Sequence, residues 1–99
     1  MHYDWDDRAA DELEAIGNLS RAHAIQAGEI FREMGNIASN PADRAWQHVD
    51  RGSWELGWWS TRSIRAYFGL SPSRMVVLHV CESSAGTALA EADRRLQEY

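Results

Sequence analysis

Three side chains in the middle of the sequence combine an anion-binding group with proton-transfer groups. Arg65 and Tyr67 are two positions apart in an alternating segment, and His79 lies in the apolar segment that follows. If the three share one face of a sheet, the guanidinium could clamp a phosphate while the imidazole, which ordinarily titrates near neutral pH, acts as a general acid or base. The pattern offers one candidate site for phosphoryl chemistry.

Each of these residues also has a purely structural interpretation. Arg65 could form an ion pair with Glu55 on the neighbouring strand, and Tyr67 could pack against a cross-strand partner. His79 could be a hydrogen-bonded core histidine, which is the more common role of histidine in an apolar strand. The sequence leaves both interpretations open for all three residues.

Tryptophans are concentrated beside this candidate site. Trp54, Trp58 and Trp59 fall within one short segment. Because side chains alternate along a strand, at least one of them is expected to point away from the core. Exposed aromatic side chains are typical anchors for a protein partner, so we expect a partner-binding surface at Trp58, Trp59 and Arg62. Stacking of the rings on nucleic-acid bases is the alternative.

The candidate residues lie on three predicted strands. Apolar residues alternate over residues 54–58 and 64–68, which is typical of strands with one buried face. Residues 75–81 are apolar nearly throughout and rich in valine, which indicates a central strand buried on both faces. The breaks over residues 60–62 and 69–73 have hairpin length, so an antiparallel meander is expected.

Two helical patterns precede these strands. Asp6 or Asp7 is expected to cap a first helix that ends near Gly17, and Ser20 to cap a second helix that stops at Gly35. A connection this short predicts an antiparallel helical hairpin whose apolar faces cover a sheet. The acidic side chains of the first helix are expected to face water: Asp11, Glu12 and Glu14.

The remaining segments complete an α+β arrangement. Residues 2–5 predict a short edge strand, residues 40–41 predict the start of one helical turn, and residues 50–52 predict a turn into the sheet. A last helix is expected over residues 88–99. The expected order is β-α-α-β-β-β-α, a small antiparallel meander sheet covered by an N-terminal helical hairpin and a C-terminal helix.

The length, the net charge and the number of cysteines restrict the class of protein. Ninety-nine residues suffice for a single domain, residues 1–99, with one core. The formal charge of −5 opposes binding to a polyanion unless a local basic face survives. Cys81 is the only cysteine, so an internal disulfide and a multi-cysteine zinc site are excluded, and a buried, inert thiol is expected.

The chain shows no signal for a membrane, a cofactor or a metal ion. No apolar segment has membrane-spanning length and the N-terminus is too acidic for a signal peptide, so a cytoplasmic location is expected. The sequence lacks a phosphate-binding glycine loop and a His/Asp/Glu cluster at ligand spacing. No cofactor and no metal are therefore expected.

Four short segments occur in an informative order. Residues 52–56 read Gly-Ser-Trp-Glu-Leu, residues 64–68 Ile-Arg-Ala-Tyr-Phe, residues 75–79 Met-Val-Val-Leu-His and residues 92–99 Ala-Asp-Arg-Arg-Leu-Gln-Glu-Tyr. These resemble, in turn, the segments Leu-Trp-Glu-Leu-Arg, Tyr-Arg-Val-Leu-Tyr, Ile-Val-Leu-Leu-His and Ala-Leu-Arg-Arg-Leu-Lys-Glu-Tyr of HigB-like and phage-borne toxins. From about residue 6 onward, the spacing and the order of elements are similar to the RelE/HigB/ParE superfamily of type II toxin–antitoxin systems. The resemblance implies a RelE-like fold.

The resemblance also implies an activity and partners. Toxins of this kind usually inhibit translation by cutting mRNA in the ribosomal A site, and a wrapping antitoxin neutralises them. Basic side chains polarise the scissile phosphate while a base activates the ribose 2′-hydroxyl. Arg65 matches the phosphate-contacting arginine of the family. Tyr67 and His79 would then complete the catalytic set, with His48 and Arg62 close by.

The chain departs from the family at most of its other basic positions. Ser53 and Glu55 stand where RelE has functional lysines, Gly57 replaces the arginine that follows Glu-Leu, and residues 82–84 replace the Lys/Arg-rich loop. Two functions on this scaffold stay open. One is a ribosome-dependent endoribonuclease, and the other is a degenerate or ParE-like binding protein, phage-encoded or not, that captures a protein target on the sheet face. A small α+β domain unrelated to toxins is the third interpretation.

Overall fold

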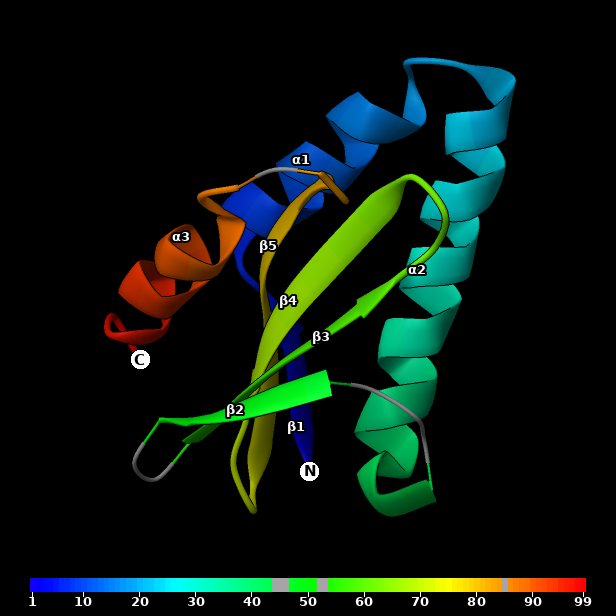
Figure 1. Ribbon diagram of the computed structural model, residues 1–99. Coiled ribbons are helices and arrows are strands. Elements are labelled where there is room, and N and C mark those ends of the chain that lie inside the picture. Colours follow the sequence, from blue (N-terminus) through cyan, green and yellow to red (C-terminus); the bar gives the residue numbers. More distant parts are fainter. Residues whose placement is uncertain (44–46, 52–53, 85) are drawn as a thin grey trace.

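The computed structural model describes residues 1–43, 47–51, 54–84 and 86–99, with the backbone alone for residues 43 and 47–51. A short strand, two helices and one 3₁₀ turn come first: β1 (His2–Trp5), α1 (Asp7–Gly17), α2 (Arg21–Ser39) and η1 (Pro41–Asp43). Consecutive strands and a last helix follow (Figure 1): β2 (Gln47–Arg51), β3 (Trp54–Ser60), β4 (Ile64–Leu70), β5 (Arg74–Glu82) and α3 (Ala88–Leu96).

The strands form one mixed sheet in the order β1-β5-β4-β3-β2. The segment from β2 to β5 is an antiparallel meander, whereas β1 runs parallel to β5. The pairing of β1 ends where Trp5 lies opposite Val77. In the described part of the chain, the second half of β5 therefore has no strand on that side, and side chains of α1 and α3 reach it instead.

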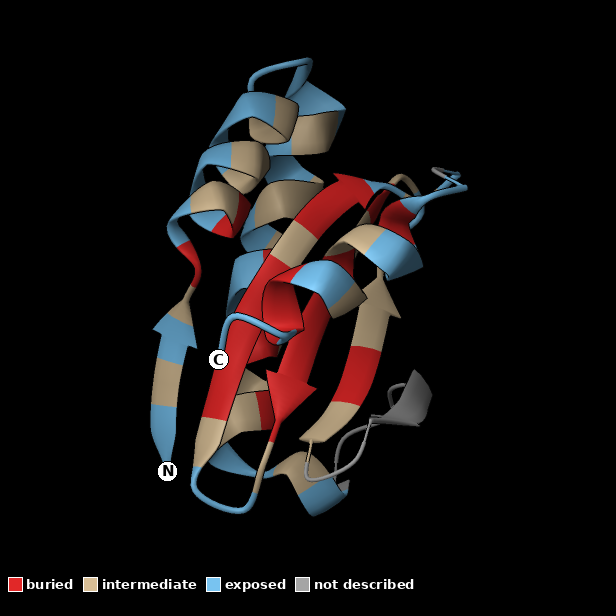
Figure 2. Cartoon of the chain, turned by 90° about the vertical axis from the view of Figure 1, so that its left-hand side faces the viewer, coloured by how far each residue is buried: buried red, intermediate tan, exposed pale blue. Residues whose placement is uncertain are grey.

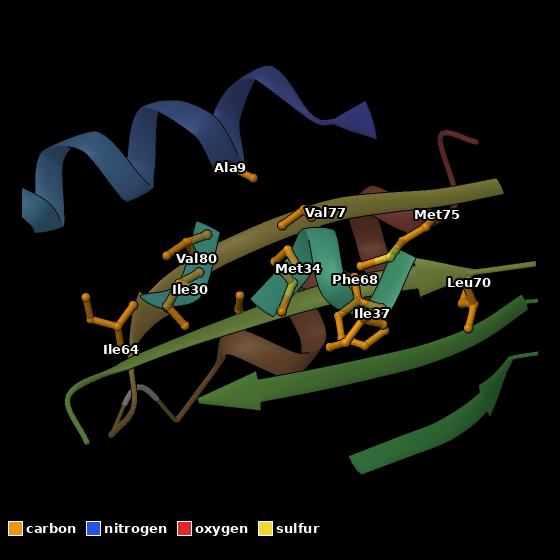
Figure 3. Packing of buried hydrophobic residues seen from close by; sticks show 11 residues of the cluster. Ala9, Ile30, Met34, Ile37, Ile64, Phe68, Leu70, Met75, Val77 and Val80 are labelled. Carbon is orange, nitrogen blue, oxygen red and sulfur yellow. The ribbon is translucent and has the colours of Figure 1, made fainter. Parts of the chain in front are cut away.

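Helices cover both faces of the sheet (Figures 1 and 2). The α1–α2 hairpin packs on one face over a core, part of which Figure 3 shows: Ala9, Ile30, Met34, Ile37, Ile64, Ala66, Phe68, Leu70, Met75, Val77 and Val80. Helix α3 packs on the other face over a second cluster: Leu56, Tyr67, Val76, Leu78, Cys81, Ala88, Ala92 and Leu96. We call these two sides the hairpin face and the α3 face.

The first two helices begin where the sequence predicts. The side chains of Asp6 and Ser20 each accept a hydrogen bond from a backbone N–H in the first turn of α1 and of α2. The predicted stop at Gly35 is wrong, because α2 continues to Ser39. The added turn brings Ile37 into the hairpin-face core, where it is fully buried, and this packing outweighs the low helix propensity of glycine.

The structure confirms the predicted α+β class, the edge strand over residues 2–5 and the antiparallel meander. The expectation of a wholly antiparallel sheet is wrong, because β1 pairs with β5 in the parallel direction. The predicted order of elements is wrong at β2, because residues 47–51 form a strand where irregular chain and a turn were expected. The sequence of β2, Gln-His-Val-Asp-Arg, has a single apolar residue and so lacks the alternation that marks the other strands. The observed order is β-α-α-β-β-β-β-α with a 3₁₀ turn before β2.

Candidate functional site

The predicted catalytic residues meet on the α3 face of the sheet. Arg65 and Tyr67 alternate with the hairpin-facing residues of β4, and Tyr67 is opposite His79 of β5. Simple alternation from Val77 would place His79 on the hairpin face. The register between β4 and β5 shifts after Tyr67, however, so that Leu78 is an extra residue and His79 lies on the same face as Tyr67.

The three side chains form a contiguous array. Nη1 of Arg65 lies 3.4 Å from the hydroxyl of Tyr67, and the rings of Tyr67 and His79 stack with their centroids 6.3 Å apart. The guanidinium carbon of Arg65 lies 3.8 Å from the centroid of the Trp58 ring, which is a cation–π contact. Nε of Arg65 is buried and has no partner among the described residues. The atom has essentially no exposed surface, so an anionic ligand could use this donor only after a movement of the side chains around it.

Glu12 of α1 binds His79, the member of the array that is farthest from Arg65. Nδ1 of His79 lies 3.0 Å from each carboxylate oxygen of Glu12. The backbone N–H of Val80 donates to Oε1 at 3.1 Å. Arg95 of α3 donates Nη1 and Nη2 to the two oxygens at 2.8 and 2.9 Å, and its Nη1 also donates to the carbonyl of Leu78 at 2.8 Å. One carboxylate thus joins α1, the irregular part of β5 and α3.

The negative charge on Glu12 determines which ring nitrogen of His79 carries the proton. Partial burial raises the pKa of Glu12, but hydrogen bonds from Arg95, from the N–H of Val80 and from His79 outweigh it and hold the pKa below its usual value. An ionised carboxylate only accepts hydrogen bonds, so Nδ1 of His79 must donate. In the neutral ring Nε2 is then the acceptor, which is the tautomer that a general base at Nε2 requires.

The members of the array and their neighbours differ in exposure. Tyr67 is 4% exposed and the side chain of His79 is 13% exposed. Arg65 and Trp58 are half-buried, and Arg62 is exposed in the turn between β3 and β4. A ligand would therefore find Arg62 exposed, whereas Tyr67 and His79 are largely covered.

The predicted partner-binding residues are divided between the two faces. Trp58 packs against the cluster under α3, whereas Trp59 packs against the hairpin-face core. Both rings are half-buried, so neither stands free on a bare outer face of the sheet. The side chain of His48 lies outside the described residues. Cys81 is buried as predicted, and burial raises the pKa of its thiol.

Two structural expectations from the sequence are wrong. The ion pair between Arg65 and Glu55 does not form, because Arg65 is opposite Ser60 while Glu55 is opposite Leu70, at the other end of β4. Glu12 does not simply face water, because its side chain is 26% exposed and serves as the acceptor for Arg95. A signal for Glu12 was present: it follows the buried Ala9 by three positions, which places both residues on one side of a helix.

The described residues hold no group of three or more His, Cys, Asp or Glu side chains that could bind a metal ion. Among the helices that the structure describes, none has the length and apolar character needed to cross a membrane. Comparisons with protein-family models, with curated proteins and with solved structures find no match for this chain. The geometry of the site and the sequence resemblance are therefore the basis for inferring a function.

Proposed function

We propose that the chain is a RelE/HigB-like toxin that inhibits translation by cutting ribosome-bound mRNA and that an antitoxin controls it. The observation that carries the proposal is the array of Arg65, Tyr67 and His79 on the α3 face, with Glu12 bound to Nδ1 of the imidazole. An anion-binding guanidinium beside a histidine of fixed tautomer is a minimal set for metal-independent cleavage of RNA. The order of the helices and strands, apart from β2, agrees with the resemblance to this family.

In the proposed reaction the ribose 2′-hydroxyl is the nucleophile. Nε2 of His79 accepts the proton from the 2′-hydroxyl as its oxygen forms a bond to the adjacent phosphorus. The bond from phosphorus to the 5′-oxygen breaks, and the 5′-oxygen takes a proton from the hydroxyl of Tyr67, which regains one from the imidazolium. Arg65 stabilises the negative charge on the phosphoryl oxygens. The products are a 2′,3′-cyclic phosphate and a 5′-hydroxyl.

The ribosome is an integral part of this proposal. Affinity for free RNA depends largely on cationic side chains that displace counterions, and the formal charge of −5 opposes such binding. A ribosome can instead present the mRNA to the few cations of the site. We therefore expect cleavage of translated mRNA and little cleavage of free RNA.

A second candidate function is the capture of a protein target without RNA cleavage. The low exposure of Tyr67 and His79 favours this alternative, because it leaves little of the site open to a nucleotide. Trp58 and Arg62 would then supply the contacts at the open side of the α3 face. Aromatic and arginine side chains are the usual anchors of such interfaces.

Cell-free translation distinguishes the two candidates. Purified protein is added to a translating lysate and the 5′ ends of the mRNA are mapped by primer extension, with Arg65→Ala in parallel. The first proposal expects ribosome-dependent cuts in phase with codons, reduced about 10²–10³-fold in Arg65→Ala. Arg94→Ala is the matched control, because Arg94 is an exposed arginine of α3, and it should cut like the wild type. Intact mRNA with undisturbed translation would contradict the first proposal.

A further inference from the structure

The outer side of the α1–α2 hairpin carries an apolar groove of about 460 Å³. Small residues from both helices form much of its lining: Ala10, Gly17, Ala24, Ala27 and Gly28. A Cβ added at Gly28 would meet nothing within 4 Å, so the groove is open at this point. Small side chains let another helix approach the backbone closely, so the shape suits a helical partner.

Large apolar side chains stand exposed on the hairpin, and one of them, Phe31, lines the groove. Leu19 is 60%, Ile25 59% and Phe31 61% exposed. All three belong to the α1–α2 hairpin or to its connection, while the α3 side has only smaller exposed fractions, such as 38% for Leu89. A cluster of exposed apolar side chains beside an apolar groove is characteristic of a protein–protein contact.

The two rims of the groove carry opposite charges. We define the rims as the exposed charged residues within about one helical turn of the lining positions. Glu14, which lines the groove, together with Asp7 and Asp11 forms the α1 rim, and Arg21 and Arg32 form the α2 rim. No ion pair within the described residues involves any of them. The hairpin is antiparallel and Phe31 stacks on Trp5, so Arg32 lies level with the start of α1 and Arg21 lies towards its end.

We propose that this groove binds the same groove of a second copy of the chain in a twofold-symmetric dimer. A rotation of 180° about an axis that lies in the contact plane, parallel to the hairpin, places each α1 over the α2 of the partner. The acidic rim of each copy then faces the basic rim of the other at both ends of the contact. A uniformly basic helix from another protein would pair with the α1 rim but would face Arg21 and Arg32 with like charge. The second copy fits both rims.

Charge exchange tests this arrangement directly. Sedimentation equilibrium at low ionic strength and at concentrations up to about 100 μM should show a reversible dimer. Arg32→Glu and Asp7→Lys should each raise the dissociation constant about tenfold, because each places like charges across the contact twice. The double variant should have a dissociation constant of about three times the wild-type value, because Lys at one rim again faces Glu at the other.

A second pair of variants tests the apolar part of the contact. Phe31→Ser should weaken the dimer about tenfold or more, whereas Leu89→Ser, the same kind of change on α3, should leave it unchanged. Circular dichroism of each variant verifies that the chain is folded. A monomer at all concentrations, or a dimer that Phe31→Ser and Arg32→Glu leave unaffected, would overturn the proposal. The experiment uses no RNA, so its outcome is independent of the proposed cleavage activity.

Discussion

Replacing Glu12 with glutamine removes the charge from the group that joins α1, β5 and α3. The amide keeps the size of the side chain and one acceptor oxygen for the backbone N–H of Val80. The same oxygen also accepts from Nη1 of Arg95, but the amide NH₂ replaces the oxygen that accepts from Nη2. Arg95, whose side chain is 8% exposed, then keeps this neutral oxygen, the carboxylate of Glu91 and the carbonyl of Leu78 as acceptors.

The expected loss of stability follows from these contacts. Breaking a fully buried ion pair costs about 3–5 kcal/mol. The figure is smaller here, because Glu12 is 26% exposed and Arg95 retains the amide oxygen, Glu91 and the carbonyl of Leu78 as acceptors. We expect Glu12→Gln to lower the free energy of unfolding by about 2 kcal/mol, which for a domain of this size lowers Tm by about 8–16 °C.

Thermal and urea unfolding at neutral pH, followed by circular dichroism, measures this loss. Glu14→Gln is the matched control, because Glu14 is exposed on the same helix, and we expect it to change the free energy of unfolding by less than about 0.5 kcal/mol. ¹⁵N NMR of the imidazole should show Nδ1 of His79 protonated in the wild type, with this preference lost in Glu12→Gln. Equal, small effects of both substitutions would refute the central role given to Glu12.

Three further perturbations follow from the packing and the charges. A Cβ at Gly69 would lie 2.6 Å from Cδ1 of the buried Leu96, so Gly69→Ala should cost about 1–3 kcal/mol in urea unfolding through overpacking. Gly28→Ala, where a Cβ meets nothing within 4 Å, should instead stabilise by about 0.5–1 kcal/mol, and equal effects of the two would contradict the packing. The third perturbation is a lower pH. Hydrogen bonds from Arg8 hold the pKa of Asp6 well below its usual range, and hydrogen bonds from Arg94 and Arg95 lower the pKa of Glu91 to about 2. Both pKa values are depressed by folding, so the stability that these carboxylates contribute is present above about pH 4 and is lost as the pH falls through their folded values. Acid unfolding followed by circular dichroism should show this progressive loss, and a gain in stability between about pH 4 and pH 2 would contradict it.

Local patterns were sufficient to predict much of the architecture. Caps at Asp6 and Ser20 depend only on the side chain and the next turn of backbone. The shared face of Arg65 and Tyr67 follows from the two-residue period of a strand. Such features involve neighbours in sequence, so the sequence carries their cause directly.

The parts that were not predicted depend on distant partners. His79 reaches the α3 face only because the register shifts at Leu78, and alternation alone gives the opposite face. The N–H of Val80 beyond this shift is bound by Glu12, 68 positions away. The spacing from Ala9 indicates only that Glu12 lies on the packed side of α1, and it gives no sign of the buried arginine of α3 that the carboxylate binds. No local pattern predicts a contact between three elements so far apart in the chain.

The chemical nature of the cut ends tests the central claim most directly. Ribosomes translating a defined mRNA are incubated with the wild-type protein, and the 3′ ends of the fragments are identified by mass spectrometry. Attack by the 2′-hydroxyl, with His79 as base and Arg65 at the phosphate, predicts 2′,3′-cyclic phosphate ends that disappear in Arg65→Ala and persist in Arg94→Ala. Intact mRNA, 3′-hydroxyl ends, or cyclic-phosphate ends that are unchanged in Arg65→Ala would contradict the assignment of the α3-face array as a ribonuclease site.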